Sequence, residues 1–443
     1  MINSLNRQQK EAVGLLQTGT FLEYFDLMLY VHMAVLLNEL FFPKTDPHTA
    51  SLLAAFAFCS AFVLRPFGAL IFGWIGDNIG RKATVIITTL MMSLSCIIMA
   101  NLPTYSQIGI LATWIITFCR ILQGLSSIGE IIGAEIYMTE ITKPPMRYPA
   151  VGFIACASAF GSVAALGIAT LVTTSGFNWR IAFWTGAAIA VIGSIARIRL
   201  RETPDFLKAK GLSNPVNKSS DIQVSKQMIK VNKETTFAYF LLSCSWPVCF
   251  FFSYIYCGNI LKDTFGYTAE QVIHQNLLLA ITEFISFLLL AFLTCRIHPL
   301  IIIKAKFFIF FPFSLSLPFI LNHIHDPSTL MIVQLFSVLF MVTDVPAGGV
   351  IYTHFPVLKR FAYTSFLHAI SRSVTYTFTS FGLVYLTEWI GHYGLLIVMV
   401  PTYLSFYWGI KHFEKLEQQN SNTNNQKLDN AKVLKTDSKI KIA

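Results

Sequence analysis

Hydrophobic and polar residues divide this chain into long apolar stretches that are separated by short polar connections. A helix needs about 20 mostly apolar residues to cross the hydrocarbon core of a bilayer. The pattern predicts twelve such helices, near 14–40, 50–76, 83–101, 107–132, 149–173, 180–200, 236–258, 273–295, 299–321, 328–352, 362–387 and 391–411. The sequence therefore predicts an all-α integral membrane protein.

One polar connection is much longer than the others and divides the predicted helices into two sets of six. This segment, 201–235, is rich in lysine, so we expect a cytoplasmic central loop between six-helix bundles at 14–200 and 236–411. Residues 1–13 form a short N-terminal segment. Residues 412–443 are rich in Asn, Gln and Lys and have no heptad pattern, which predicts a disordered tail rather than a coiled coil.

Charge distribution predicts the orientation of these helices. If both ends are cytoplasmic, 27 of the 33 Lys and Arg residues fall on the cytoplasmic side or at its helix ends. Loops on that side normally carry an excess of Lys and Arg. The first apolar stretch is interrupted by Glu23 and Asp26, so it is interpreted as an uncleaved first span and not as a signal peptide.

Composition excludes several other classes of protein. Only 13% of the residues are charged and the mean hydropathy is +0.58, whereas soluble proteins carry roughly 25% charged residues. The net charge of +10 does not indicate nucleic-acid binding, because Lys and Arg lie between the spans and at the chain ends. The eight cysteines form no Cys-x-x-Cys pair, so neither a disulfide framework nor a zinc site is indicated, and no cofactor is expected.

A short polar turn separates the second and third predicted spans. It contains Gly73, Asp77 and Gly80, followed by Arg81 and Lys82. The glycines allow close approach of two backbones, and Asp77 can accept hydrogen bonds from the start of a neighbouring helix. The two cations hold this turn on the cytoplasmic side. We expect a gating turn here.

Two acidic residues lie inside the first predicted span. Glu23 and Asp26 are three residues apart, so they share one face of a helix, with Tyr24 between them. An ionised carboxylate in lipid is costly, so both must face a polar cavity, each other or a cation. They are candidates for carrying a proton, and pairing with arginine to hold helices together is the alternative.

Further polar residues lie in the second and fourth spans. Arg65 can neutralise the first-span carboxylates or bind a substrate carboxylate with its planar fork. Arg120 lies deep in an apolar setting and needs an anionic partner. Gln123 and Glu130 are seven residues apart and share a face, and Glu130 lies near the cytoplasmic end.

Together these segments resemble the metabolite–proton symporters of the major facilitator superfamily, the branch that includes proline/betaine and dicarboxylate carriers. The resemblance covers about residues 14–210 and is carried by Gly19-x-x-x-Glu23-Tyr24-Phe25-Asp26, Arg65-Pro66-Phe67-Gly68, the turn at 73–82, Arg120 to Glu130, Trp179-Arg180 and Glu202-Thr203-Pro204. It implies the major facilitator fold. It also implies proton-coupling roles for Glu23, Asp26 and Glu130, and substrate-binding roles for Tyr24, Arg65, Arg120 and Gln123.

The second half departs from that family pattern. The corresponding turn has Cys295 in place of its acidic residue, and His298 and Pro299 in place of its last Gly and Arg. Glu283, Asp344 and Arg372 remain as charges inside predicted spans.

These observations favour a proton-driven transporter that imports a small carboxylate-bearing solute by alternating access. An osmoprotectant such as proline or glycine betaine needs one cationic partner and an aromatic surface. A dicarboxylate or tricarboxylate such as 2-oxoglutarate or citrate needs two cations, and a non-transporting membrane sensor or scaffold is the alternative from another class. An enzyme is not indicated, because no phosphate-binding loop, metal-binding histidine pair or nucleophile elbow is visible. We expect a monomer in a bacterial inner membrane, whose partners are the bilayer, protons and the solute.

Overall fold

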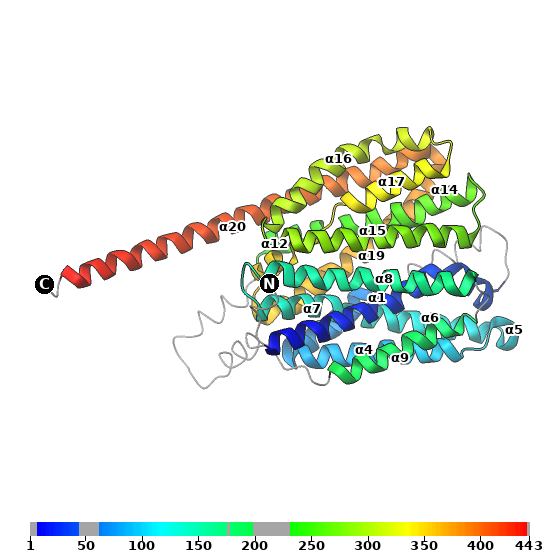
Figure 1. Cartoon of the computed structure of the whole chain (residues 1–443), viewed down its shortest axis with the longest axis horizontal. Coiled ribbons are helices and arrows are strands. Elements are labelled where there is room, and N and C mark those ends of the chain that lie inside the picture. Colours follow the sequence, from blue (N-terminus) through cyan, green and yellow to red (C-terminus); the bar gives the residue numbers. More distant parts are fainter. Residues whose placement is uncertain (1–6, 44–61, 175–177, 198–230, 441–443) are drawn as a thin grey trace.

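The computed structural model describes residues 7–43, 62–174, 178–197 and 231–440, and these residues form helices and no strand. Figure 1 shows two groups of roughly parallel helices packed one above the other. The first bundle contains α1 (Arg7–Phe41), α3 (Arg65–Asn78), α4 (Arg81–Asn101), α5 (Tyr105–Ile108), α6 (Ile110–Ser126), α7 (Ile128–Ile141), α8 (Arg147–Thr174) and α9 (Arg180–Arg197).

The second bundle follows residue 230. It contains α12 (Lys233–Ser243), α13 (Ser245–Phe250), the π-helical turn η2 (Phe251–Tyr256), α14 (Cys257–Asp263), α15 (Ala269–Leu293), α16 (Pro299–Asn322), α17 (Pro327–Phe340), α18 (Gly348–Ile351), η3 (Tyr352–His354), α19 (Val357–Ile390), η4 (Gly391–Tyr393) and α20 (Gly394–Ile440).

The helices have the length and surface expected for a membrane protein. Within the described residues, seven helical stretches are long and apolar enough to cross a membrane. Helices also occupy the described part of the predicted spans, with an interruption in the tenth. Large side chains such as Trp114, Phe378 and Trp389 are exposed on the outside. A lipid environment accounts for such a surface, which would be unfavourable in water.

The two bundles contact each other along two helix pairs, α8 with α15 and α3 with α19. On the first pair, Phe153 and Phe292 meet edge to face with ring centroids 5.6 Å apart. A Cβ atom added to Gly152 would lie 3.1 Å from the Cβ of Ala291, so a larger residue here would push the two helices apart by a few tenths of an ångström. Small residues of this kind permit close packing of membrane helices.

The tenth predicted span, 328–352, is not one continuous helix. Helix α17 ends at Phe340, and the chain runs without regular helix from Met341 until α18 begins at Gly348. Non-helical backbone at membrane depth occurs where it is covered by protein or lines a cavity. The prediction of an unbroken helix here is therefore wrong.

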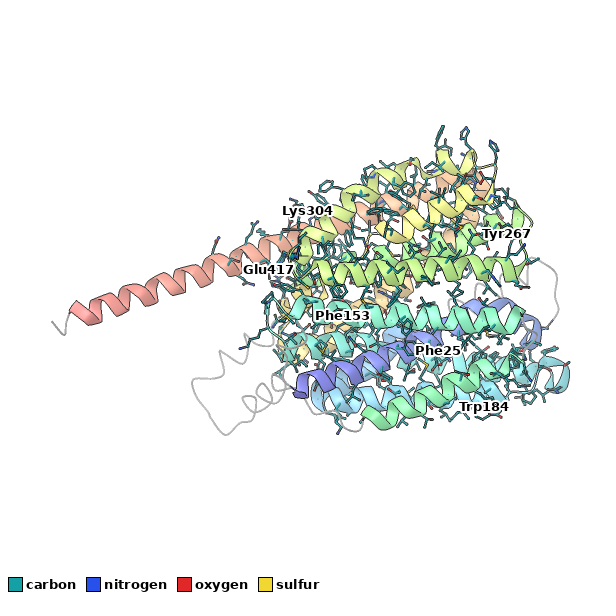
Figure 2. The ribbon with its side chains drawn as sticks, in the orientation of Figure 1. Phe25, Phe153, Trp184, Tyr267, Lys304 and Glu417 are labelled. Carbon is teal, nitrogen blue, oxygen red and sulfur yellow. The ribbon has the colours of Figure 1, made fainter. Side chains whose placement is uncertain are left out.

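The predicted span near 299–321 coincides with α16 (Pro299–Asn322), which carries two lysines near its start. Helix α16 begins at Pro299 and includes Lys304 and Lys306, and Lys306 is buried inside the second bundle. Figure 2 labels Lys304 and Glu417 at the end of the molecule where α1 begins and α20 leaves the bundle. We call this end the terminal face.

The tail is helical where the sequence predicted disorder. Helix α20 continues to Ile440 and projects from the terminal face in Figure 1. Lys304 forms an ion pair of 2.8 Å with Glu414, and His354 forms one of 2.8 Å with Glu417, so the helix is held beyond the predicted span. The hydrogen bond from His354 also lowers the pKa of Glu417. The segment after residue 411 contains no proline or glycine that would end a helix.

Gly161 offers a test of the packing within the first bundle. A Cβ atom at this position would lie 2.3 Å from the backbone oxygen of Phe21 on α1, whereas Gly167 on the same helix has open space around it. We expect Gly161→Val to destabilise the protein by about 1–3 kcal/mol through overpacking. Thermal unfolding in detergent measures this loss, and Gly167→Val is the matched control. Equal melting temperatures for both variants would contradict the packing described here.

Candidate functional site

The two bundles enclose a cavity of about 50 Å³, which we call the central cavity. This volume holds only a few water molecules, so a solute can enter only if the bundles or side chains move apart. The titratable residues that line it are Tyr24, Glu135, Tyr254, Glu283, Asp344, Tyr352, His368 and Arg372. Tyr24 and Glu135 belong to the first bundle and the other six belong to the second.

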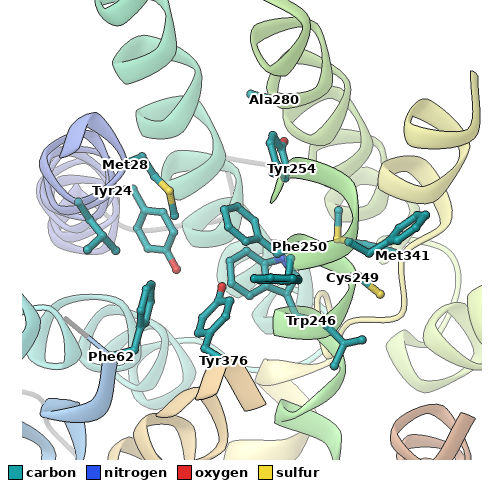
Figure 3. Packing of buried hydrophobic residues seen from close by; sticks show 14 of the residues in the cluster. Tyr24, Met28, Phe62, Trp246, Cys249, Phe250, Tyr254, Ala280, Met341 and Tyr376 are labelled. Atoms are coloured by element: carbon teal, nitrogen blue, oxygen red, sulfur yellow. The ribbon is translucent and has the colours of Figure 1, made fainter. Parts of the chain in front are cut away.

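An aromatic wall closes the second-bundle side of the central cavity. It is formed by Trp246, Phe250 and Tyr254, and the ring centroids of neighbouring members lie 5.1 and 4.8 Å apart. Figure 3 shows these rings across from Tyr24 and Met28, which come from α1. A wall of stacked rings presents π faces that can bind a cationic group.

Glu283 on α15 holds two members of the aromatic wall in place. The indole N–H of Trp246 donates to one carboxylate oxygen at 3.4 Å, and the hydroxyl of Tyr254 donates to the other at 2.9 Å. In a regular α-helix, residues eight apart point about 80° away from each other. The wider π-helical turn Phe251–Tyr256 reduces that offset, so both side chains reach the same carboxylate.

A cation lies beside this wall. The guanidinium carbon of Arg372 is 4.9 Å from the centre of the Trp246 ring, and one of its nitrogens lies 3.2 Å from His368 Nδ1. Asp344, on the irregular segment after α17, is close enough to interact electrostatically with Arg372. The cavity thus combines one arginine with the carboxylates of Glu135, Glu283 and Asp344.

Two carboxylates of α7 bind residues of the opposite bundle. The hydroxyl of Tyr352 donates to Glu135 at the edge of the cavity. Nearer the terminal face, Arg360 forms an ion pair of 3.1 Å with Glu140. These two contacts join the bundles on the side of the terminal face.

The predicted gating turn adds a third contact. The backbone N–H of Ala362 on α19 donates to Asp77 at 2.9 Å, which is the kind of contact that the sequence predicts for this residue. A Cβ atom on Gly73 would lie 2.9 Å from the Cα of Ala362. Gly80 has a φ of 150°, which other residues rarely adopt. Asp77, Glu135 and Glu140, with their partners Ala362, Tyr352 and Arg360, form what we call the gate layer.

The two cations of the gating turn do not both have a described side chain. The side chain of Arg81 lies outside the described residues, and Lys82 is half-buried at the start of α4. Their predicted role on the cytoplasmic side stays a prediction.

Three functional residues were predicted in the first span, Glu23, Tyr24 and Asp26. Of these three, only Tyr24 lines the central cavity. Glu23 and Asp26 are buried in the first bundle, and Glu23 interacts electrostatically with Arg65. Asp26 lies beside Cys96 and packs so closely on Gly186 that a Cβ atom there would be 2.3 Å from its carboxylate. Within the described residues, neither oxygen of Asp26 has a nitrogen or hydroxyl donor.

The predicted arginines also lie behind the cavity wall. The guanidinium carbon of Arg65 is 4.4 Å from the centre of the Phe62 ring, and that of Arg120 is 3.8 Å from the centre of the Tyr30 ring. Arg120 also donates to Gln123 at 3.1 Å. Neither arginine nor Gln123 is among the residues that line the central cavity.

The remaining predicted residue, Glu130, lies on α7, but its side chain is outside the described residues. Sequence reasoning did not single out Glu135, Glu140 or Tyr352, and it named Arg372 only as one of the charges inside predicted spans. The available signal for Glu135 and Glu140 is their position on the helix that follows Arg120, where the predicted span ended too early at residue 132.

Comparison with known proteins gives relatives of one kind. The family described as "Sugar (and other) transporter" matches residues 15–297. Inner membrane metabolite transport protein YhjE of Escherichia coli (strain K12) is 31% identical over 276 residues, which are 60% of each chain. The proline/betaine transporter of Salmonella typhimurium is 33% identical over 208 residues, 44% of this chain and 41% of that protein. The alignments thus span 41–60% of these relatives.

Solved structures share the fold. The proton:xylose symporter XylE of the major facilitator superfamily, bound to 6-bromo-6-deoxy-D-glucose, superposes with a TM-score of 0.75 at 16% identity. The match covers 91% of this chain and 95% of that one. The human organic anion transporter MFSD10 gives a TM-score of 0.66 at 13% identity, and the match covers 91% of this chain and 100% of that one. At these identities the likeness shows the fold alone.

The hydrogen bond from Trp246 to Glu283 can be tested by Trp246→Phe. This change keeps an aromatic ring and removes the indole N–H, so the buried carboxylate loses one of its two donors. We expect a loss of about 1–3 kcal/mol in stability, measured by thermal unfolding in detergent. Trp114→Phe, at an exposed position, is the matched control and should leave the melting temperature nearly unchanged. A similar change in both variants would speak against the role of Glu283 as an anchor.

Proposed function

Because this chain belongs to the sugar (and other) transporter family of the major facilitator superfamily, we propose that it imports a small zwitterionic solute together with protons. The fold provides two six-helix bundles that can rock around a site between them. The transported solute is an osmoprotectant of the proline or glycine betaine class. The central cavity, with one arginine beside an aromatic wall, is the observation that carries this proposal.

The two ends of such a solute find complementary groups in the central cavity. Its carboxylate binds the guanidinium of Arg372, which can form paired hydrogen bonds with a carboxylate. Its cationic nitrogen lies against the rings of Trp246 and Phe250, since a cation is attracted to the face of an aromatic ring. Asp344 and Glu283 add negative charge on the same side.

A dicarboxylate fits this cavity less well. It needs a second cation, but Arg65 and Arg120 do not line the cavity. Three lining carboxylates, Glu135, Glu283 and Asp344, would instead repel a dianion. The names of curated relatives agree with this preference, because several are proline/betaine transporters.

Proton coupling supplies the energy for accumulation. A neutral zwitterion that enters with one proton carries one positive charge, and the membrane potential favours that movement by about 2.3 kcal/mol per 100 mV. This energy corresponds to roughly fortyfold accumulation. Asp26 is suited to carry the proton, since an ionised carboxylate buried without a cationic partner is costly.

Uptake into proteoliposomes tests the solute and the driving force together. We expect labelled proline and glycine betaine to accumulate when a proton gradient is imposed, and a protonophore to abolish the accumulation. Accumulation of 2-oxoglutarate or citrate instead would assign the chain to the dicarboxylate carriers. Absence of uptake for all four solutes would favour a sensor or scaffold.

Asp26→Asn tests the proton site. The variant keeps the volume of the side chain but cannot bind and release a proton, so we expect the accumulation ratio to fall from roughly fortyfold at 100 mV to about one. Exchange of labelled for unlabelled solute should persist, which shows that the protein is inserted and binds its solute. Undiminished accumulation by this variant would exclude Asp26 as the coupling residue.

A further inference from the structure

Glu135 belongs both to the central cavity and to the gate layer. It lies on α7 of the first bundle, is 8% exposed and lines the cavity. Its carboxylate accepts the hydrogen bond of Tyr352 from η3 of the second bundle. Glu140, one to two turns further along α7, binds Arg360 but does not line the cavity. Glu135 is thus the gate-layer carboxylate that a proton or a solute in the cavity can reach.

We propose that protonation of Glu135 opens the gate layer on the terminal face, so that Glu135 transmits the occupancy of the cavity to the gate. This inference rests on the proposed proton-coupled transport. A hydrogen bond to an ionised carboxylate is about twice as strong as one between neutral groups. Protonation therefore weakens the link between Glu135 and Tyr352 and lets the bundles separate there.

The surroundings of Glu135 make its charge sensitive to the solute. The titratable groups that face it come from five elements and are Tyr24 of α1, Tyr239 of α12, Asp344 of the segment after α17, Tyr352 of η3 and Arg372 of α19. Asp344 repels a negative charge on Glu135 and Arg372 attracts it. A solute carboxylate bound to Arg372 cancels that attraction, and so favours uptake of a proton by Glu135. Solute binding and gate opening are coupled in this way.

The proton is conserved through the cycle. The coupling proton enters from the outer aqueous phase, is held first by Asp26 and then passes to Glu135, where it converts the carboxylate to the neutral acid. When the gate opens, it passes to water on the terminal side. The carboxylate that remains accepts the Tyr352 hydroxyl again, and the gate closes.

Thiol labelling of the full chain can measure gate opening without any solute. Val151 is 2% exposed and lines the cavity, and a Cβ atom added to Gly348 or Gly349 of the opposite bundle would lie 3.4 Å from one of its methyl carbons. In Val151→Cys, a membrane-impermeant maleimide added from the terminal side reaches the thiol only when the gate opens. Mass spectrometry quantifies labelling at this one position. We expect the labelling rate to rise roughly five- to tenfold as the pH is lowered through the titration of Glu135.

Three further substitutions, each combined with Val151→Cys, distinguish control of the gate layer by protonation of Glu135 from simple loss of a contact. Glu135→Gln should label fast at every pH, because its neutral amide mimics the protonated carboxyl. Tyr352→Phe should also label fast at every pH, since the donor is lost, and it serves if Glu135→Gln folds poorly. Glu140→Gln, the matched control, should loosen the gate and keep the dependence on pH.

The outcomes are distinct. A labelling rate that depends on pH in Glu135→Gln as it does in the parent, or that does not depend on pH in the parent, would overturn the proposal. If the pH dependence requires Glu135 but no solute is taken up, the gate inference holds and the proposed solute class falls. If uptake is normal but the labelling rate does not depend on Glu135, the proposed solute class holds and the gate inference falls.

Discussion

Burial of charge between two apolar bundles is the constraint on which the rest of this structure depends. An ionised side chain inside a low-dielectric interior is costly unless a partner compensates it. Glu135 and Glu140 both lie on α7 of the first bundle. Tyr352 binds Glu135 and Arg360 binds Glu140, and both of these partners come from the second bundle. Separation of the bundles leaves these groups uncompensated until water reaches them, so the same charges that close the interface also define where it can open.

The interface between the bundles is built so that it can part. Where α3 meets α19, Gly73 lies directly against the backbone of Ala362, and where α8 meets α15, Gly152 lies against Ala291. At these two points the helix backbones approach closely, because the glycine carries no side chain. Polar contacts such as that of Asp77 with Ala362 then supply most of the specificity of the closed arrangement. Rocking of whole bundles needs few rotamer changes at these positions.

The sequence was sufficient for the helices and for one contact of the gate layer, but not for the cavity. Hydropathy places each span, since it depends only on the length and composition of a stretch. Asp77 was predicted to accept a hydrogen bond, because a carboxylate is favourable beside the start of a neighbouring helix. Arg65 and Arg120 were expected at the substrate, yet both lie behind the cavity wall. Which face of a helix looks inward depends on its rotation against its neighbours, and a sequence pattern does not contain that rotation.

Two further differences have the same physical origin. The fourth span was predicted to end near residue 132. Helix α7 instead continues to Ile141, since Glu135 and Glu140 are compensated by the opposite bundle. The tail was predicted to be disordered, but α20 continues past residue 411, and its first turns there are held by the ion pairs of Glu414 with Lys304 and Glu417 with His354. In each case contacts from elsewhere in the chain stabilise the helix beyond the predicted span.

The interrupted stretch between α17 and α19 connects the central cavity with the gate layer. Asp344 lies near one end of this segment and faces the cavity, and Tyr352 lies near the other end and binds Glu135. A continuous helix would hold both residues rigidly with respect to the second bundle. The irregular stretch from Met341 to Gly348 allows the backbone around Asp344 to adjust when charge in the cavity changes. In the proposed mechanism, such an adjustment shifts α18 and η3, and with them the hydroxyl of Tyr352, so that a local change of charge leads to movement at the gate layer.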